Sequence, residues 1–262
     1  MSQDKFSNLG SAIVDLGNNF ATTESEISAM ALRLAGAGSQ IGMTEGDIVG
    51  FAAALSSVGI EAEAGGSAFS KVMVNMQLAA ENGMGSFDEL IARGKESGVS
   101  FESMTKAVQD GGKNLKSTAG EMGLTSKQLK TMYKEADDAA ISLQQFAEVA
   151  GMTNSEFGNL FKESPAEAIM AFVEGLAHAE EQGKSAIAVL DGMDIKEVRL
   201  RDSLLRAANA SGVFAGAVEM GNKAFGENTA LAEEAGKRYE TTESKLKMLR
   251  NEAVNAAIDL GG

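Results

Sequence analysis

The sequence predicts an all-α protein: an irregular bundle of many short and medium helices, joined by tight turns that end in glycine, with a long helix at the C-terminus. Three observations support this. Glycine is frequent, at 30 of 262 residues, whereas proline occurs once, at Pro165. Disordered or collagen-like chains rich in glycine are also rich in proline, so this glycine is better explained as helix punctuation and close packing. No stretch alternates apolar and polar residues between turn dipeptides, as strands would.

The third observation is a short recurring pattern: a glycine, an apolar residue, and a residue that can begin a helix. The glycine can close one helix in the left-handed conformation. The last residue accepts hydrogen bonds from the free N–H groups of the next helix, and the apolar residue can pack across the turn. The pattern occurs at Gly42-Met-Thr44, Gly59-Ile-Glu61, Gly98-Val-Ser100, Gly123-Leu-Thr125, Gly151-Met-Thr153 and Gly192-Met-Asp194.

These signals predict the following order of helices. We expect them near residues 8–20, 23–37, 44–58, 61–81, 86–97, 100–110, 114–122, 125–150, 153–162, 165–181, 184–191, 194–211, 212–226 and 228–260. Capping boxes support five starts, at Ser86 with Glu89, Thr125 with Gln128, Thr153 with Glu156, Ser164 with Glu167, and Asp194 with Glu197. Ser164 precedes Pro165, which suits a first helical position. Residues 187–190 are the one weak strand candidate, and we favour a helix there.

The last predicted helix is the longest. One side of it can be formed by Leu231, Ala235, Tyr239, Leu246, Leu249, Ala253, Ala256 and Leu260. Because this helix has hardly ended when the chain stops, we expect the sequence to belong to a longer protein. We divide it into an N-terminal helical lobe (1–81), an inserted or mobile helical arm (82–140) and a C-terminal helical lobe (141–262). A solvated hairpin of helices is the alternative for the region rich in Gly, Ser and Lys at 82–124.

Composition excludes several classes of function. The net charge is −14, and such a surface repels phosphate and disfavours nonspecific nucleic-acid binding. No cysteine is present, so disulfides and cysteine-based metal sites are excluded. The longest charge-free apolar runs, 48–60 and 207–218, are short of the ~20 residues of a membrane span, and the N-terminus lacks the apolar run of a signal peptide.

Glycine-rich segments give two weak motifs. Gly36-Ala-Gly38-Ser-Gln-Ile-Gly42 is faintly similar to a dinucleotide fingerprint, but its spacing is wrong and no strand precedes it, so we interpret it as a helix-to-helix turn. Gly212-Val-Phe-Ala-Gly216 has the spacing of small residues at which helices approach closely, and we predict close packing there.

No set of side chains predicts catalysis. His178 is the single histidine, and one histidine without cysteine cannot form the usual zinc or Ser–His constellations. The pairs Asp137-Asp138 and Glu233-Glu234 are interpreted as solvated surface, and Asp191-Gly-Met-Asp194 lacks the ligand spacing of a calcium loop. We therefore predict that the chain is not an enzyme and has no catalytic, cofactor-binding or metal-binding residues.

Two other groups of residues could form binding surfaces. The methionines, 14 in all, are better explained as core filling than as a groove, because several stand at the turn position described above. Six lysines gather in the middle of the chain, but without the interleaved aromatic residues of a single-strand binder. They are Lys106, Lys113, Lys116, Lys127, Lys130 and Lys134.

Several blocks of the sequence, in order, resemble the core region of phage tail tape measure proteins of the TP901 type. The most specific block runs from Gly42-Met-Thr-Glu45 to Lys71, through Phe51-Ala-Ala-Ala-Leu-Ser-Ser-Val-Gly-Ile60. The other blocks are Ala12 to Gly36, Phe146 to Phe157, Pro165 to Leu176, and Asn228 to Asn251. Residues 82–140 look like an insertion that shorter members lack.

The resemblance implies a structural virion protein of a long-tailed phage or prophage, made in the bacterial cytoplasm and housed in the tail lumen. Such proteins take part in tail assembly, length determination and DNA ejection. The implied partners are tail-tube, tail-tip or tail assembly chaperone proteins, or further copies of the chain. We expect no specific nucleic-acid binding. A membrane-active helical module used during genome ejection is the alternative, supported by the apolar runs at 48–60 and 207–218, and membrane contact stays open.

Overall fold

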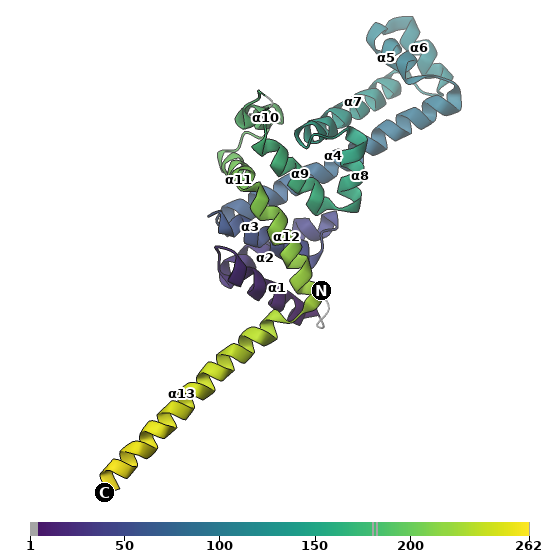
Figure 1. Ribbon diagram of the computed structural model, residues 1–262. Helices are drawn as coiled ribbons and strands as arrows, with labels where there is room; N and C mark the ends of the chain where they lie inside the picture. The colour runs from purple at the N-terminus through teal and green to yellow at the C-terminus, as the bar shows by residue number, and fades with distance from the viewer. Residues whose placement is uncertain (1–4, 180, 182, 262) are drawn as a thin grey trace.

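A computed structural model describes residues 5–179, 181 and 183–261, and every regular element within them is a helix, as the sequence predicts (Figure 1). The helices are α1 (Phe6–Asn19), α2 (Glu24–Ile41), α3 (Glu45–Ser57), α4 (Ala62–Ser97), α5 (Phe101–Asp110), α6 (Gly112–Glu121), α7 (Ser126–Val149), α8 (Asn154–Glu163), α9 (Pro165–Ala177), α10 (Ala186–Gly192), α11 (Val198–Asn209), α12 (Ser211–Glu227) and α13 (Ala230–Gly261).

The recurring glycine turns have the predicted geometry at five of six positions. Gly42, Gly59, Gly98, Gly123 and Gly151 all have positive φ, between 65° and 92°. The N–H of the apolar residue that follows reaches back to a carbonyl five residues earlier, as when Met43 N bonds to Gly38 O at 2.9 Å. These bonds satisfy carbonyls that a helix end leaves free, which is the Schellman arrangement.

The next residue then begins the following helix. Thr44, Thr125 and Thr153 each form a complete capping box, and so does Thr23. The middle apolar side chains Met43, Ile60 and Val99 are buried, so each turn also fixes a core residue. Half-buried Met152 and Met193 pack against the same core, in agreement with the expectation that the turn methionines fill space.

Four details of the prediction are wrong. The expected helices 61–81 and 86–97 form one helix, α4, which runs through Gly83 and Ser86 without a new start. At the sixth turn the left-handed residue is Asp194, with φ of 58°, rather than Gly192. Asp194 therefore caps no helix, and α11 starts at Val198. The side chain of Ser164 also makes no capping hydrogen bond, although Pro165 takes the first helical position as expected.

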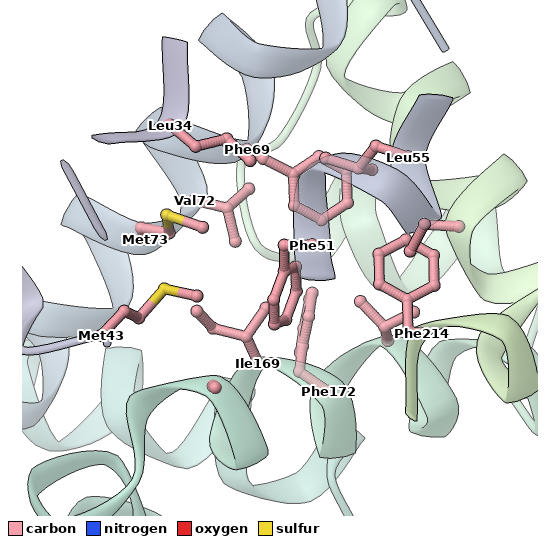
Figure 2. Packing of buried hydrophobic residues seen from close by; sticks show 14 of the residues in the cluster. Leu34, Met43, Phe51, Leu55, Phe69, Val72, Met73, Ile169, Phe172 and Phe214 are labelled. Carbon is pink, nitrogen blue, oxygen red and sulfur yellow. The ribbon is translucent and has the colours of Figure 1, made fainter. Parts of the chain in front are cut away.

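One large core unites helices α1–α4 with helices α7–α12. Figure 2 shows Phe51 and Leu55 of α3, Phe69 of α4, Phe172 of α9 and Phe214 of α12 packed into it. The Phe51 and Phe214 rings meet edge to face, with centroids 5.6 Å apart. Helices from residues 6–81 and from 141–227 thus share one body, and the expected divisions at residues 81 and 140 fall inside α4 and α7.

A second, smaller core lies in the arm. The arm consists of the C-terminal part of α4, helices α5 and α6, and the N-terminal part of α7, and it extends from the body in Figure 1. Its buried residues are Leu90, Val99, Met104, Leu115, Ala119, Met122, Leu129 and Ala136. Phe101 and Tyr133 stack beside them, with centroids 5.9 Å apart. Because α4 and α7 continue unbroken into the body, the arm is anchored by two helices rather than by loops.

Candidate functional surfaces

A close helix crossing in the body joins α3 to α12, and it depends on glycine. A Cβ on Gly50 would stand 2.6 Å from the Cα of Val218 and 2.7 Å from the carbonyl oxygen of Ala217. A Cβ on Gly221 would stand 2.6 Å from the carbonyl oxygen of Gly46. These are backbone atoms, so the two helices can approach this closely only where side chains are absent. The crossing fixes α12 and therefore the place from which α13 leaves the body.

The predicted close packing at Gly212 and Gly216 is not found. Among the described residues no atom lies within 4 Å of the place a Cβ on Gly212 would take, and only a Phe20 ring carbon, at 4.0 Å, approaches that of Gly216. Small residues do mark a close helix approach in this protein, but the residues involved are Gly221 further along α12 and Gly46 and Gly50 on α3. Sequence periodicity alone does not say which of two such faces meets a partner.

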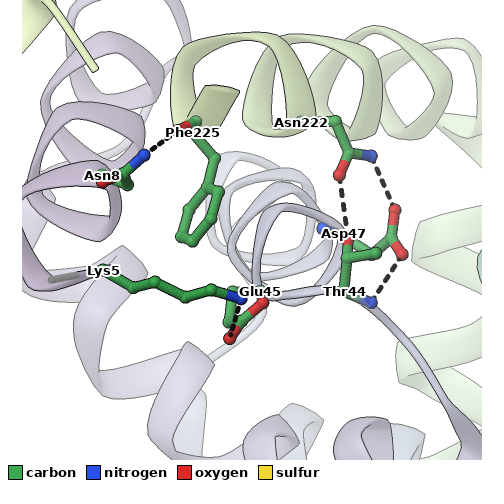
Figure 3. Close-up of polar contacts among 7 residues, drawn as sticks. All are labelled: Lys5, Asn8, Thr44, Glu45, Asp47, Asn222 and Phe225. Atoms are coloured by element: carbon green, nitrogen blue, oxygen red, sulfur yellow. Dashed lines mark hydrogen bonds and ion pairs between the residues drawn. The ribbon is translucent and has the colours of Figure 1, made fainter. Parts of the chain in front are cut away.

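Polar contacts hold the N-terminal end of α3 against α12 and α1 (Figure 3). The Thr44 hydroxyl donates to Asn222 Oδ1 at 2.8 Å, and Asn222 Nδ2 donates to Asp47 at 2.7 Å, so α12 is hydrogen-bonded to both residues of the capping box of α3. Lys5 forms an ion pair with Glu45 at 3.4 Å. These residues are separated by up to 178 positions in the chain, and no local sequence signal pairs them.

The joint between α12 and α13 is clamped by α1. Asn228 ends α12 in the left-handed conformation, with φ of 53°. Its side-chain oxygen accepts hydrogen bonds from the hydroxyls of Ser7, at 2.9 Å, and Ser11, at 3.0 Å. The buried Ser11 hydroxyl also accepts from the backbone N–H of Leu231 at 3.3 Å, and Leu231 packs on Gly10. The clamp determines the direction in which α13 leaves the body.

Beyond this joint α13 leads away from the body (Figure 1). It is 32 residues long, or about 48 Å at 1.5 Å per residue. Beyond Leu231, its described large apolar residues are Tyr239, Leu246, Met248 and Leu249, exposed at 77%, 61%, 58% and 61% of their surface. Single exposed apolar residues need no explanation, but a row of them along an unsupported helix indicates a surface that another molecule covers.

The arm carries the six lysines singled out in the sequence. All are exposed, on α5, α6 and the first half of α7. Residues 98–134 contain these six lysines and three acidic residues, a net charge of +3 in a chain of net charge −14. The end of the arm is thus the locally basic part of an acidic protein, which suits contact with an acidic surface.

The body has several grooves, of which two have distinct linings. An apolar one of about 590 Å³ runs between α1, α2 and α3, beside Leu9, Ile13 and Ile48, with the exposed side chain of Leu32 at its rim. Another of about 650 Å³ lies where the arm meets the body, between α4, α7 and the segment after α10, and has Glu135 and Asp138 on its wall.

The residues considered for chemistry are scattered. His178 is half exposed and lies 3.3 Å from Glu181, and Asp137 and Asp138 are exposed. Gly36 and Gly38 lie inside α2, which continues to Ile41, so of the segment predicted as a turn only Gly42 ends the helix. Within the described part of the chain, no group of three or more His, Cys, Asp or Glu side chains could hold a metal ion. No helix there combines the length and apolarity needed to cross a membrane.

The pKa values that shift belong to side chains at two helix caps and at one turn, and these side chains do not form a cluster. Hydrogen bonds from the Thr153 backbone and hydroxyl lower the pKa of Glu156, and the Thr23 hydroxyl and backbone lower the pKa of Glu26 in the same way. A hydrogen bond from Lys196 lowers the pKa of Asp194, and this contact raises the pKa of Lys196. Because each cause is a local contact at an exposed position, these shifts indicate helix and turn stabilisation.

Comparison with known proteins gives no relative: no family model, no curated protein and no solved structure matches this chain.

Proposed function

We propose that this chain is a structural module of a phage tail tape measure protein, acting in tail assembly and length determination and in DNA ejection. The observation that carries the proposal is the ordered set of sequence blocks that resemble the core region of that family. The most specific block, Gly42 to Lys71, folds into the end of α2, α3 and the start of α4. Much of this block is buried in the body, so the resemblance concerns packing residues and supports a shared fold.

The role within such a protein is that of a compact module at one point along the ruler, not the ruler itself. A continuous helix of 262 residues would extend about 390 Å, at 1.5 Å per residue. The left-handed glycines instead fold residues 6–227 into a body and an arm, in which α4, at about 54 Å, is the longest helix. The length of such a body does not grow in proportion to its residues, as a ruler requires.

The module acts through its projecting parts. The arm and α13 extend from the body in different directions, and each exposes a surface that differs from the acidic whole. We propose that these surfaces contact tail-tube, tail-tip or assembly chaperone proteins, or other copies of the chain, in the virion tail lumen. The net charge of −14 would reduce adhesion to passing DNA.

The alternative of a membrane-active module loses the feature that favoured it. Of the two apolar runs, residues 48–55 are buried in the core as part of α3. In the other run Ala207, Ala208, Phe214, Ala217 and Val218 are buried in the same core. Their apolar composition is therefore explained by packing within the body, and it does not favour lipid over a protein partner.

The test is the protein composition and length of phage tails. Tails are purified from the phage or prophage that encodes the chain and searched for its peptides by mass spectrometry. We expect its peptides in tails, and we expect Gly50→Leu, which wedges apart α3 and α12, to stop tail assembly while heads still form. Gly36→Ala, at an exposed helical position, is the matched control and leaves tails normal. Tails without its peptides would overturn the proposal. If peptides are present, normal tails from a Gly50→Leu variant shown to be unfolded in isolation would also overturn it.

A further inference from the structure

Helix α13 carries a sequence repeat that its position in the fold leaves unused. Its small and apolar residues alternate at spacings of four and three: Ala235, Tyr239, Thr242, Leu246 and Leu249. The same spacing continues in the sequence at Ala253, Ala256 and Leu260, and no charged residue stands at any position of the repeat. A strict seven-residue repeat is the pattern of a coiled coil, in which one helix packs along another. A helix resting on a globular surface keeps a broader apolar stripe with a repeat of 3.6.

We propose that α13 pairs with α13 of a second copy of this chain in an antiparallel two-stranded coiled coil, in which Leu246 of each copy faces Leu249 of the other. The helix is available for this contact, because Tyr239, Leu246 and Leu249 are exposed and the helix leads away from the body (Figure 1). The pairing places the two bodies at opposite ends of a shared rod. This inference does not rest on the proposed function.

Side-chain size favours the antiparallel orientation. A parallel pair would align Tyr239 of one copy with Tyr239 of the other in a single layer, and Thr242 with Thr242 in the next. With Leu246 opposite Leu249, the antiparallel register separates these like residues, and the leucines of both copies fill the central layers.

Charge favours the same orientation. In the antiparallel register Glu243 of each copy flanks Arg250 of the other, which gives two attractive pairs. In a parallel dimer Lys245 would flank Arg250 twice, and these repulsions would offset the attraction between Arg238 and Glu243. Within one helix Glu243 already pairs with Lys247 at 2.9 Å, but both side chains are mostly exposed, so this contact contributes little and does not oppose the new one.

The charged residues beside the apolar row also fit a second copy of the chain better than they fit a lipid surface. Charges of both signs border the apolar row, with Glu243 and Arg250 on one side and Arg238 and Lys245 on the other. A helix bound to anionic lipid is typically basic on its polar face. A row bordered by acid and base is instead self-complementary in the antiparallel register.

The first test measures association of the full 262-residue chain by light scattering after size exclusion and by sedimentation over a range of concentrations. We expect a dimer. Arg250→Glu should raise its dissociation constant by about tenfold, since two attractive pairs become repulsive. The exchanged variant Glu243→Arg with Arg250→Glu should restore it. Lys162→Glu makes the same charge change on α8 and is the matched control, with circular dichroism verifying the fold of each variant.

The second test fixes orientation. Since the natural chain has no cysteine, single cysteines report only on the positions chosen. Under mild oxidation, Glu243→Cys chains mixed with Arg250→Cys chains should form a mixed disulfide dimer, while Tyr239→Cys chains alone should not. A chain that stays monomeric at the highest measurable concentration, a trimer or hexamer, efficient cross-linking of Tyr239→Cys with itself, or tighter association of Arg250→Glu would each overturn the proposal. A failed dimer would leave the tail-composition test of the proposed function unaffected.

Discussion

Replacing Gly50 with alanine should destabilise the body, although alanine is the better helix former. In an exposed helix the change gains about 1 kcal/mol from helix propensity. At Gly50 the new Cβ would lie 2.6 Å from the Cα of Val218 and 2.7 Å from the carbonyl oxygen of Ala217. Neither atom can move by a side-chain rotation, so α12 must shift by about 1 Å to reach ordinary contact distance.

The size of the effect follows from what that shift disturbs. The crossing of α3 and α12 brings Phe51 against Phe214, and both rings are buried. Overpacking of a filled core costs about 1–3 kcal/mol, and backbone obstruction puts this site at the upper end. After subtraction of the propensity gain, we expect Gly50→Ala to lower the free energy of unfolding by about 2 kcal/mol. That corresponds to a fall in Tm of about 4–8 °C for a chain of this size.

Urea unfolding followed by circular dichroism at 222 nm measures this loss. The matched control is Gly36→Ala, since Gly36 is exposed in α2 and within the described chain no atom lies within 4 Å of its Cβ position. Gly36→Ala should gain about 0.5–1 kcal/mol. The near-ultraviolet signal of Tyr133, which lies in the arm, should change little in either variant. Equal stabilisation by both substitutions would refute the reasoning, because it would mean that α3 and α12 do not touch through backbone.

Three further predictions concern the joint, the caps and the arm. Asn228→Gly keeps the left-handed turn but removes the acceptor of two hydroxyl hydrogen bonds, so proteolysis near residue 229 should accelerate while the body's Tm changes by less than about 3 °C. The lowered pKa of Glu156 contributes stability that is present above the ordinary glutamate pKa and is lost as pH falls through the lowered one. Thr153→Ala should therefore flatten the change in the urea midpoint between about pH 5 and pH 3, and an unchanged slope would contradict this. Leu129→Ala should lower the free energy of unfolding of the arm by about 2–5 kcal/mol, because it leaves a cavity in the smaller core. The near-ultraviolet signal of Tyr133 should then be lost before the body unfolds, and a single transition shared by arm and body would contradict this prediction.

The local helix punctuation could be predicted from the sequence. Five of the six glycine turns, the capping boxes at Thr125 and Thr153, and Pro165 at a first helical position are confirmed. These features depend on residues within about five positions of one another, where φ freedom and side-chain acceptors act directly on the backbone. The all-α class follows from the same short-range physics.

The joint that orients α13 could not be found in this way. The sequence predicts Asn228 at the start of the last helix, whereas it ends α12, and nothing in the sequence marks Ser7 and Ser11 as its partners more than 200 residues away. The same holds for Asn222, which completes the cap of α3. Such contacts arise because the fold brings distant helix ends together, and each participating residue type is common at exposed positions.

Most helix ends follow from the sequence, because glycine φ and local hydrogen bonds settle them. The continuation of α4 through residues 82–85 depends on tertiary contacts, since the packing of α4 against α7 outweighs the low helix propensity of glycine there. Tertiary contacts also select Gly46, Gly50 and Gly221, and not Gly212 and Gly216, for the close crossing. Small residues permit close approach, but which of them meet depends on how the surrounding helices are already held by the shared core.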